Sequence, residues 1–433
     1  TYDIYGRMLT ATQQMTLSGA AGTTPAVTSY TYNVMGMKTS ETTPRAANAA
    51  YDGQFTASYA YDTVGRLSTI GRKYENGAAN QTVTTQYAYD AVGNQVSVTD
   101  EAGRETTYTY DSMNRVASVT NALNETTSYS YDLAGNRIQE ARPNGTWTYE
   151  FDVMNRLSVT KNPDGTVVQK LLYDANGNVI KQIDANGYAS GLTDNTRYGT
   201  TYTYNEENLV EQITTPEGNT TTYTYTARGD VRSVTDGTGG VTSYIYYTDE
   251  VTHVIDPLGN MTQYSYDLAG NRTWVRDPLG NVTTYEYGAF GLLLSMTDPL
   301  NRSIAYEYDT EGNLVKTTDK AGRETAYSYD NRGHLTAKSS GGQSVSYSYD
   351  TMGNRISMTD STGTYTYTYD ALDRVTTQAK DGSTQVSYGY DTAGNMTQVG
   401  YNGMTVAYTY DNQNRMTAVS GGGASASDTY DNN

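Results

Sequence analysis

The chain has 433 residues, no cysteine and a formal net charge of −18, which excludes disulfides and thiolate metal sites and disfavours nucleic-acid binding. Its 44 tyrosines, against 3 phenylalanines and 2 tryptophans, favour a single-layer β-sheet over a thick apolar core, because tyrosine combines β propensity with a hydrated hydroxyl. The nearest approach to a basic stripe is Arg72-Lys73, which stands alone in the sequence. No apolar run comes near the roughly 18 residues that cross a bilayer.

The first 86 residues contain long and irregular repeats. Tyr2, Tyr32, Tyr61 and Tyr89 follow one another at 30, 29 and 28 residues. The additional residues lie in small-residue segments at 18–25 and 45–50. We expect these segments to be longer loops between strands and not separate domains.

Residues 87–433 repeat with a nearly constant period. In Thr107–Val116, two tyrosines alternate with threonines as in a β-strand, an Asp-Ser-Met-Asn turn follows, and a second strand begins at Val116. A period of 20 or 21 residues indicates a repeat architecture and outranks other local signals. The regular tyrosine-aspartate steps begin at Tyr89, Tyr110, Tyr131, Tyr308, Tyr329, Tyr349, Tyr369, Tyr390 and Tyr410.

Two turns divide each repeat into two strands. Three residues after the aspartate position stands Gly, Asn or Asp, the residues that adopt positive φ at low cost, and Tyr247 is the exception. This pattern predicts a three-residue hairpin loop closed by a left-handed residue. The second turn has the type I signature, as in Asp100–Gly103, Asp256–Gly259 and Asp277–Gly280. Each repeat is therefore predicted to be a β-hairpin with strands of about six residues.

The predicted fold is all-β, with antiparallel hairpins joined into one continuous sheet over residues 1–433. One face carries tyrosine and aliphatic residues and the other carries Thr and Ser, so a long sheet must spiral to cover the first face. One interval, from Tyr173 to Tyr204, is 31 residues long. We expect a longer loop near 182–199 there.

Candidate catalytic residues are few. The two histidines, His253 and His334, have no neighbouring pattern of a nucleophile or of metal ligands. Aspartates that recur every repeat are expected to cap their own turns and not to form a catalytic dyad. Trp147 and Trp274 are expected to pack inward from the strands. We predict a protein without catalytic, cofactor-binding or metal-binding residues.

Calcium is the one ion that the sequence leaves open. Asp174–Asn178 contains oxygen ligands, but the glycine and acid spacing of an EF-hand is absent. A solvated turn is the favoured interpretation. Weak binding of Ca²⁺ to the acidic surface remains a possibility.

The repeats resemble the tyrosine-aspartate (YD) repeats of the Rhs family, which also occur in wall-associated bacterial proteins, in insecticidal toxin complexes and in teneurin ectodomains. The resemblance is carried by units such as Tyr87–Asn94 and Tyr347–Arg355, and the frequent Asn-Arg step favours a bacterial source. It implies a sheet that spirals into a hollow shell around a C-terminal toxin released by self-cleavage. The Asp-Pro-Leu-Gly segments at 256–259 and 277–280 recur in register, so they are interpreted as turns and not as the cleavage motif of the family.

The resemblance implies a secreted or surface-exposed, non-enzymatic segment of a larger protein, because the chain begins and ends within repeats. The expected partners are the enclosed toxin of the same parent chain or neighbouring copies of the protein, without nucleic acid or a membrane span. The tyrosine rows that would form the wall include Tyr108, Tyr129, Tyr306 and Tyr327. The alternative is an extracellular fibre or adhesin, and a carbohydrate-binding surface is a third possibility.

Overall fold

The computed structural model describes residues 1–16, 23–44, 56–76, 79–185 and 199–430. These residues form 38 strands in a single sheet. Each strand pairs antiparallel with the next strand in the chain, from β1 with β2 to β37 with β38. The predicted all-β fold of antiparallel hairpins is confirmed.

The strands are mostly five to seven residues long, and one short 3₁₀ turn, η4 (Ala289–Gly291), stands between β24 and β25. The strands are β1 (Thr10–Thr16), β2 (Thr23–Tyr32), β3 (Lys38–Thr42), β4 (Thr56–Tyr61), β5 (Leu67–Asn76), β6 (Ala79–Tyr89), β7 (Gln95–Thr99), β8 (Glu105–Tyr110), β9 (Val116–Thr120), β10 (Thr126–Tyr131), β11 (Arg137–Arg142), β12 (Gly145–Phe151), β13 (Leu157–Lys161), β14 (Val167–Tyr173), β15 (Val179–Asp184), β16 (Gly199–Tyr204), β17 (Val210–Thr214), β18 (Thr220–Tyr225), β19 (Val231–Thr235), β20 (Val241–Tyr247), β21 (Glu250–Ile255), β22 (Met261–Tyr266), β23 (Arg272–Arg276), β24 (Val282–Tyr287), β25 (Leu293–Thr297), β26 (Ser303–Tyr308), β27 (Leu314–Thr318), β28 (Glu324–Tyr329), β29 (Leu335–Ser340), β30 (Gln343–Tyr349), β31 (Arg355–Asp360), β32 (Gly363–Tyr369), β33 (Val375–Lys380), β34 (Ser383–Tyr390), β35 (Met396–Tyr401), β36 (Met404–Tyr410), β37 (Met416–Gly421) and β38 (Ala424–Ser427).

The turn that follows each tyrosine strand, which we name the tyrosine turn, has the predicted geometry. After β8, the N–H of Asn114 donates to the carbonyl of Asp111 at 3.0 Å, and Asn114 has a φ of 59°. The register then shifts, so that Tyr110 pairs with Val116. This is the three-residue loop closed by a left-handed residue. At the exceptional Tyr247, a tight turn with Thr248 at a φ of 54° replaces it.

The turn that leads into the next tyrosine strand, which we name the return turn, occurs in two forms. Asp100–Gly103 has the predicted form, with Gly103 at a φ of 78°. Gly341-Gly342 and Asn402-Gly403 are instead two-residue turns with positive φ at both positions, which is the type I′ hairpin. The shorter turn explains the 20-residue intervals at Tyr329–Tyr349 and Tyr390–Tyr410. This form was not among the predicted turns, although Asn-Gly is its usual signal.

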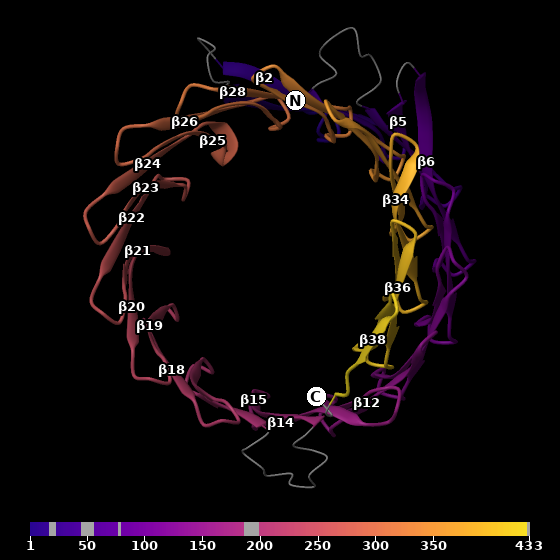
Figure 1. Ribbon diagram of the computed structural model, residues 1–433, viewed down its shortest axis with the longest axis vertical. Coiled ribbons are helices and arrows are strands. Elements are labelled where there is room, and N and C mark those ends of the chain that lie inside the picture. The colour runs from indigo at the N-terminus through magenta and orange to yellow at the C-terminus, as the bar shows by residue number, and fades with distance from the viewer. Residues whose placement is uncertain (17–22, 45–55, 77–78, 186–198, 431–433) are drawn as a thin grey trace.

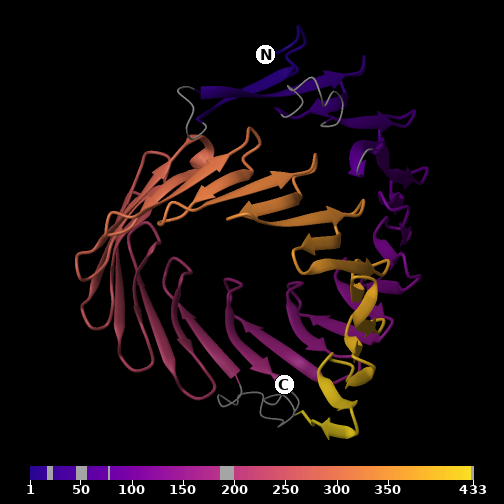
Figure 2. The same cartoon turned by 45° about the horizontal axis from the view of Figure 1, so that its top comes forward.

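The sheet winds as a ribbon around an open centre, and its C-terminal part forms a second winding (Figure 1). Strands β34, β36 and β38 lie alongside the first winding near β6 and β12, which the tilted view confirms (Figure 2). Strands twist with a fixed hand, so a long meander of short strands curls instead of staying flat. The predicted spiral is confirmed.

The sheet is a single layer with little fully buried surface. In β8 the burial alternates, with Tyr108 and Tyr110 half-buried and Thr107 and Thr109 exposed. Among the described residues, the buried apolar side chains are Ala26, Val83, Val159, Val167, Ile183 and Ala185. Most apolar burial therefore comes from tyrosine rings against neighbouring repeats and not from a central core.

The irregular N-terminal region differs from the prediction in one respect. Thr23–Pro25 was expected in a loop, but these residues belong to β2, where Pro25 pairs with Gln14 of β1. Strands β5 and β6 likewise pair over eight positions. The added residues lengthen hairpins because each extra cross-strand pair adds ladder hydrogen bonds. The loop predicted near 182–199 is shorter, because Gln182–Asp184 belong to β15 and Gly199 to β16, which pair with each other. The predicted loop residues 18–22, 45–50 and 186–198 lie outside the described residues.

Candidate functional site

The tyrosine hydroxyls join successive repeats, a role that was not predicted from the sequence. A tyrosine at or near the end of a strand donates to a carbonyl of the preceding hairpin, as Tyr131 does to Val116 at 2.9 Å and Tyr369 to Arg355 at 2.8 Å. Val116 is the residue that pairs with Tyr110 at the register shift. Each hydroxyl thus satisfies a carbonyl at the irregular end of the neighbouring ladder. The donors are Tyr32, Tyr61, Tyr89, Tyr110, Tyr131, Tyr173, Tyr204, Tyr225, Tyr246, Tyr266, Tyr308, Tyr329, Tyr349, Tyr369, Tyr390, Tyr410 and Tyr430.

The turn aspartates cap their own turns, as expected. One carboxylate oxygen of Asp111 accepts from the N–H groups of Met113 and Arg115, at 2.8 and 3.0 Å. The backbone N–H of Arg115, followed by its guanidinium, holds the pKa of Asp111 below its ordinary value. The buried Asp298 has a more strongly lowered pKa, first because of the Lys320 ammonium at 2.8 Å and then because of Arg302. Bonds to the ionised form favour it.

An arginine at the end of many tyrosine turns connects one repeat to the next. Arg115 donates through Nε to Asp111 at 2.7 Å and through Nη1 to the carbonyl of Asp132 at 3.2 Å. Its guanidinium also lies over the ring of Tyr131, 4.4 Å from the centroid. The same three contacts recur at Arg7, Arg66, Arg156 and Arg374.

An asparagine at the same position makes a different connection. Asn94 donates to Asp90 at 2.9 Å and to the side-chain oxygen of Asn114 in the next turn at 3.0 Å. In this type of connection the next turn supplies an Asn or Asp oxygen at the positive-φ position. After the arginine type, that position is glycine, as at Gly135 and Gly177. The asparagine type recurs at Asn136–Asn155, Asn178–Asn208, Asn354–Asp373 and Asn395–Asn414.

The two windings meet along a contact that we name the seam. Tyrosine turns of the second winding lie against return turns or loops of the first. Arg104 donates to both carboxylate oxygens of Asp373, at 2.8 and 3.1 Å, across 269 residues. Thr43–Glu311 and Asn144–Asn414 bridge 268 and 270 residues. Contacts between the two windings bridge 231 to 270 residues along the chain, and polar side chains hold the second winding on the first.

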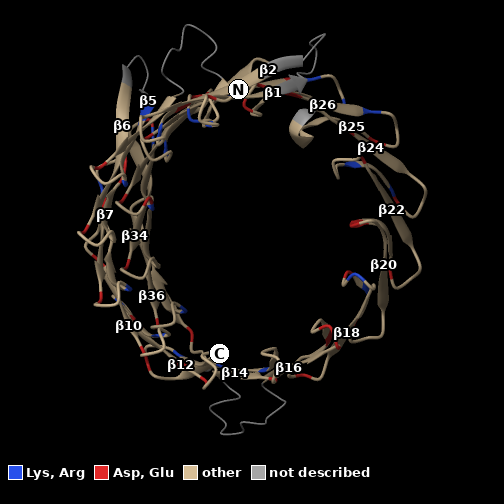
Figure 3. Ribbon diagram, turned by 180° about the vertical axis from the view of Figure 1, so that it is seen from behind, with Lys and Arg blue, Asp and Glu red and all other residues tan. Residues whose placement is uncertain are grey.

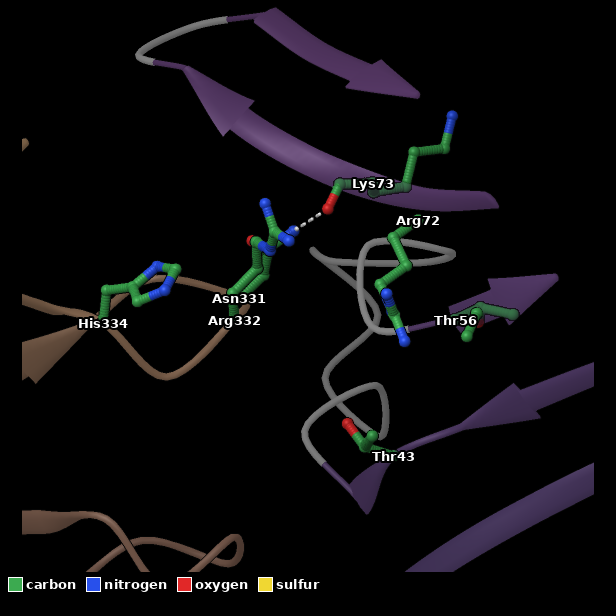
Figure 4. Close-up of a pocket in the computed structure, with 8 residues that line it drawn as sticks. Thr43, Thr56, Arg72, Lys73, Asn331, Arg332 and His334 are labelled. Atoms are coloured by element: carbon green, nitrogen blue, oxygen red, sulfur yellow. Dashed lines mark hydrogen bonds between the residues drawn. The ribbon is translucent and has the colours of Figure 1, made fainter. Parts of the chain in front are cut away.

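Another part of the seam surrounds Glu101. Its buried carboxylate accepts from Arg332 of the second winding at 2.5 Å and from Arg72 of the first at 3.3 Å. Nearby, Asn331 donates to the carbonyl of Lys73 at 3.1 Å (Figure 4). The basic pair Arg72-Lys73, isolated in the sequence, is thus brought beside Arg332 and helps to close the seam.

A cavity of about 350 Å³ opens beside these residues, lined in part by Thr43, Thr56, Lys73 and His334. Across the molecule, Asp and Glu concentrate at the turns and Lys and Arg lie among them (Figure 3). Glu101 pairs with both Arg72 and Arg332, so its single carboxylate compensates only part of the positive charge of this cavity.

The two histidines contact side chains of their own strands and turns. His253 lies beside Thr252, with 3.0 Å between Nδ1 and Oγ1, and His334 contacts Asp330 at 2.9 Å and stacks on Tyr349. The described residues contain no group of three or more His, Cys, Asp or Glu side chains that could hold a metal ion. No helix of the described part has the length and hydrophobicity of a membrane-spanning segment.

The suggested oxygen-ligand loop is a capped turn. Asp174 accepts from the N–H groups of Asn176 and Asn178, and its other oxygen accepts from the side chain of Asn178. This geometry is that of the favoured interpretation, and calcium binding itself stays a prediction.

One prediction about the tryptophans is wrong. Trp147 lies on the tyrosine face, two residues before Tyr149 in β12. Trp274, however, pairs directly with Ser265, so it lies on the Thr and Ser face of the sheet. Tyr264 lies on the other face and pairs with Val275. The register shift at Tyr266 changes which second-strand residues share the tyrosine face, and strand alternation alone does not reveal that shift.

The Teneurin YD-shell family model matches residues 164–326 and 313–432, and the RHS Repeat model matches residues 89–123 and 114–146. A search of curated proteins finds no match.

Among solved structures, the crystal structure of TcdB2-TccC3-Cdc42 and that of TcdB2-TccC3 without its hypervariable C-terminal region each match with a TM-score of 0.68 and 14% identity. The matches cover 97% of this chain and 27% of those chains, so this chain spans about a quarter of their length. At that identity the likeness concerns the fold. The winding sheet, the recurrent tyrosine turn and the family match over more than half of the residues lead to one conclusion: the chain belongs to the Teneurin YD-shell family.

Proposed function

We propose that this chain is a non-enzymatic segment of the wall of a secreted or surface-exposed shell, and that the shell encloses a toxin carried by the same parent protein. The observation that carries the proposal is the winding of the sheet. The ribbon completes a turn around an open centre before it meets itself, and the seam then fixes the second winding on the first.

The construction of the wall supports this function. Tyrosine hydroxyls, arginines and asparagines connect each hairpin to the next, so the wall is continuous without a packed core. At the seam, the two windings are joined by hydrogen bonds of side chains and not by backbone hydrogen bonds between strands. A wall of this kind separates its contents from the solvent while leaving the centre free for a polypeptide. Membership of the YD-shell family and the fold of TcdB2-TccC3 support the same proposal.

The test is electron microscopy of the intact parent protein, combined with limited proteolysis. Closed hollow particles with internal density, and a cargo that resists protease, are the expected result. The double variant Arg104→Met/Asp373→Asn should make the cargo more accessible to protease, because it removes the ion pair of the seam.

Arg323→Met is the matched control, since Arg323 pairs with Asp319 within its own turn and is mostly exposed. Long filaments without enclosed density, or a cargo digested as fast as an unprotected polypeptide, would overturn the proposal. Filaments would favour the alternative, an extracellular fibre.

A further inference from the structure

The cavity beside Glu101, which we name the seam cavity, is lined by basic side chains from both windings. Arg72 and Lys73 come from β5 in the first winding, and Arg332 and His334 come from the tyrosine turn after β28 in the second. Among the described residues that line this cavity, none is Asp or Glu, although the chain has 47 acidic and only 29 basic residues. A cavity of this composition in an acidic protein favours an anion.

The contacts of the seam do not use all of this positive charge. Glu101, whose side chain is 6% exposed, accepts from Arg332 at 2.5 Å and from Arg72 at 3.3 Å, so two guanidinium groups share one carboxylate. Within the described part of the chain, the guanidinium of Arg72 has no other hydrogen-bond partner, and 45% of its side chain is exposed. One positive charge therefore remains for a ligand.

Two further carboxylates near the seam cavity are engaged by other groups. Glu311 accepts from the hydroxyl of Thr43 at 2.9 Å. Asp330 accepts from the backbone N–H groups of Arg332 and His334, and its other oxygen lies 2.9 Å from the His334 ring. Neither carboxylate lines the cavity, so an anion there would not compete with them for Arg72.

The two guanidinium groups approach the seam cavity from different elements (Figure 4). Arg72 extends from β5 on the side of Thr56, and Arg332 lies on the facing turn. The ammonium of Lys73 is directed away from that turn, so the two arginines are the principal charged donors. Planar guanidinium groups bind oxyanions through paired N–H donors, and threonine hydroxyls add neutral donors.

We infer that the seam cavity binds a phosphate group, or another tetrahedral oxyanion, between Arg72 and Arg332. Each guanidinium belongs to a different winding, so the bound anion bridges the windings and strengthens the seam. The volume of about 350 Å³ also leaves room for a small organic group on the phosphate. This inference does not depend on the presence of a cargo.

Isothermal titration calorimetry of the 433-residue chain with inorganic phosphate, at constant ionic strength, tests the inference. We expect one site with a dissociation constant of roughly 0.1–10 mM, because a few charge-assisted hydrogen bonds replace hydration of the anion. Glycerol 3-phosphate is the second probe. Tighter binding of this probe than of inorganic phosphate would identify a phosphomonoester as the ligand, and equal binding would identify the free anion. No saturable binding of either probe up to about 50 mM would overturn the inference.

A variant in the first winding makes the test specific. Arg72→Gln should weaken phosphate binding at least about tenfold, whereas Glu101 keeps Arg332 as its partner. Arg323→Gln is the matched control and should bind like wild type, because Arg323 is mostly exposed and pairs within its own turn. Far-UV circular dichroism verifies that both variants fold. Unchanged affinity in Arg72→Gln would place the anion elsewhere and overturn the inference.

Hydrogen exchange measures whether the anion bridges the windings. Phosphate should slow the exchange of backbone amides in the turn at 330–334 at least about twofold in the wild-type chain, and not in Arg72→Gln. Binding without this protection would mean that the anion contacts the first winding alone, which would overturn the bridging role. A negative result would leave the proposed enclosure of a cargo intact, because that proposal is tested on the parent protein.

Discussion

At the scale of single residues, the chain depends on a few side chains whose geometry is repeated. A residue with positive φ closes each three-residue tyrosine turn, as Gly353 does at 89° and Asn114 at 59°. A terminal tyrosine hydroxyl bonds the preceding hairpin. Repetition makes the roles easy to recognise, because the same atom meets the same partner in one repeat after another.

Replacing Gly353 with Val should lower the free energy of unfolding by roughly 1 kcal/mol or more. A β-branched residue resists positive φ, and a Cβ at this position would lie 2.8 Å from Nε2 of His334. Gly93→Asn is the control and should have little effect, because the space there is open and asparagine occupies the equivalent position at 114. Chemical denaturation measures both, and a Gly353→Val chain as stable as wild type would contradict the turn assignment.

Replacing Tyr369 with Phe should destabilise the protein by about 1 kcal/mol, because the carbonyl of Arg355 loses its hydroxyl donor. Tyr367→Phe, two residues earlier in β32, is the control. Tyr367 lies under the guanidinium of Arg355 and makes no hydroxyl hydrogen bond in the described structure. Urea titrations measure the free energy of unfolding of both variants. An equal decrease in the two would show that the hydroxyl bond of Tyr369 does not stabilise the protein.

At the scale of the elements, the unit of stability is the connection between adjacent hairpins. A two-stranded hairpin alone is marginal in water, and here each hairpin is tied to the next through the backbone ladder, a tyrosine hydroxyl and an arginine or asparagine. An Arg at the end of one turn is followed by Gly in the next turn, whereas an Asn that connects to the next turn meets Asn or Asp there. Asn271 and Asn313 are followed by Gly291 and Gly333, so the pairing holds in many repeats but not in all.

Arg115→Ala should lower the free energy of unfolding by about 1–2 kcal/mol, because it removes an ion pair, a bond to the next turn and a cation–π contact together. Arg323→Ala removes an exposed pair within one turn and should cost about 0.5 kcal/mol or less. Thermal and urea unfolding measure the stability of both variants. A similar decrease in the free energy of unfolding for Arg115→Ala and Arg323→Ala would mean that the connection between hairpins does not add stability.

At the scale of the whole molecule, small contributions add over many repeats. Many of the turn aspartates have a lowered pKa. The largest lowering cause is the backbone N–H of Arg115 at Asp111 and the side chain of Asn271 at Asp267. The stabilisation from such a group is present above the unfolded carboxyl pKa of about 4. It is lost as the pH falls through the lower folded value.

The melting temperature should therefore change little between about pH 5 and 8 and fall steeply below about pH 4, because many aspartates must take up protons together. Asp111→Asn should reduce this dependence on acid, since its amide oxygen can cap the turn as Asn205 does for Glu207 and Leu209. Differential scanning calorimetry across this range provides the measurement. A melting temperature that is constant down to pH 2 would contradict the linkage.

The sequence by itself determined the repeat, the antiparallel hairpin and the closure of the tyrosine turn, because these depend on residues near one another in the chain. It also identified which aspartates cap turns. It misplaced Thr23–Pro25 and Trp274, since hairpin length and register shifts depend on how two strands pair. Only the tertiary structure decided how many residues make one winding and which turns form the seam. Those features arise from twist accumulated over many strands and from contacts 231 to 270 residues apart, for which a local period carries no signal.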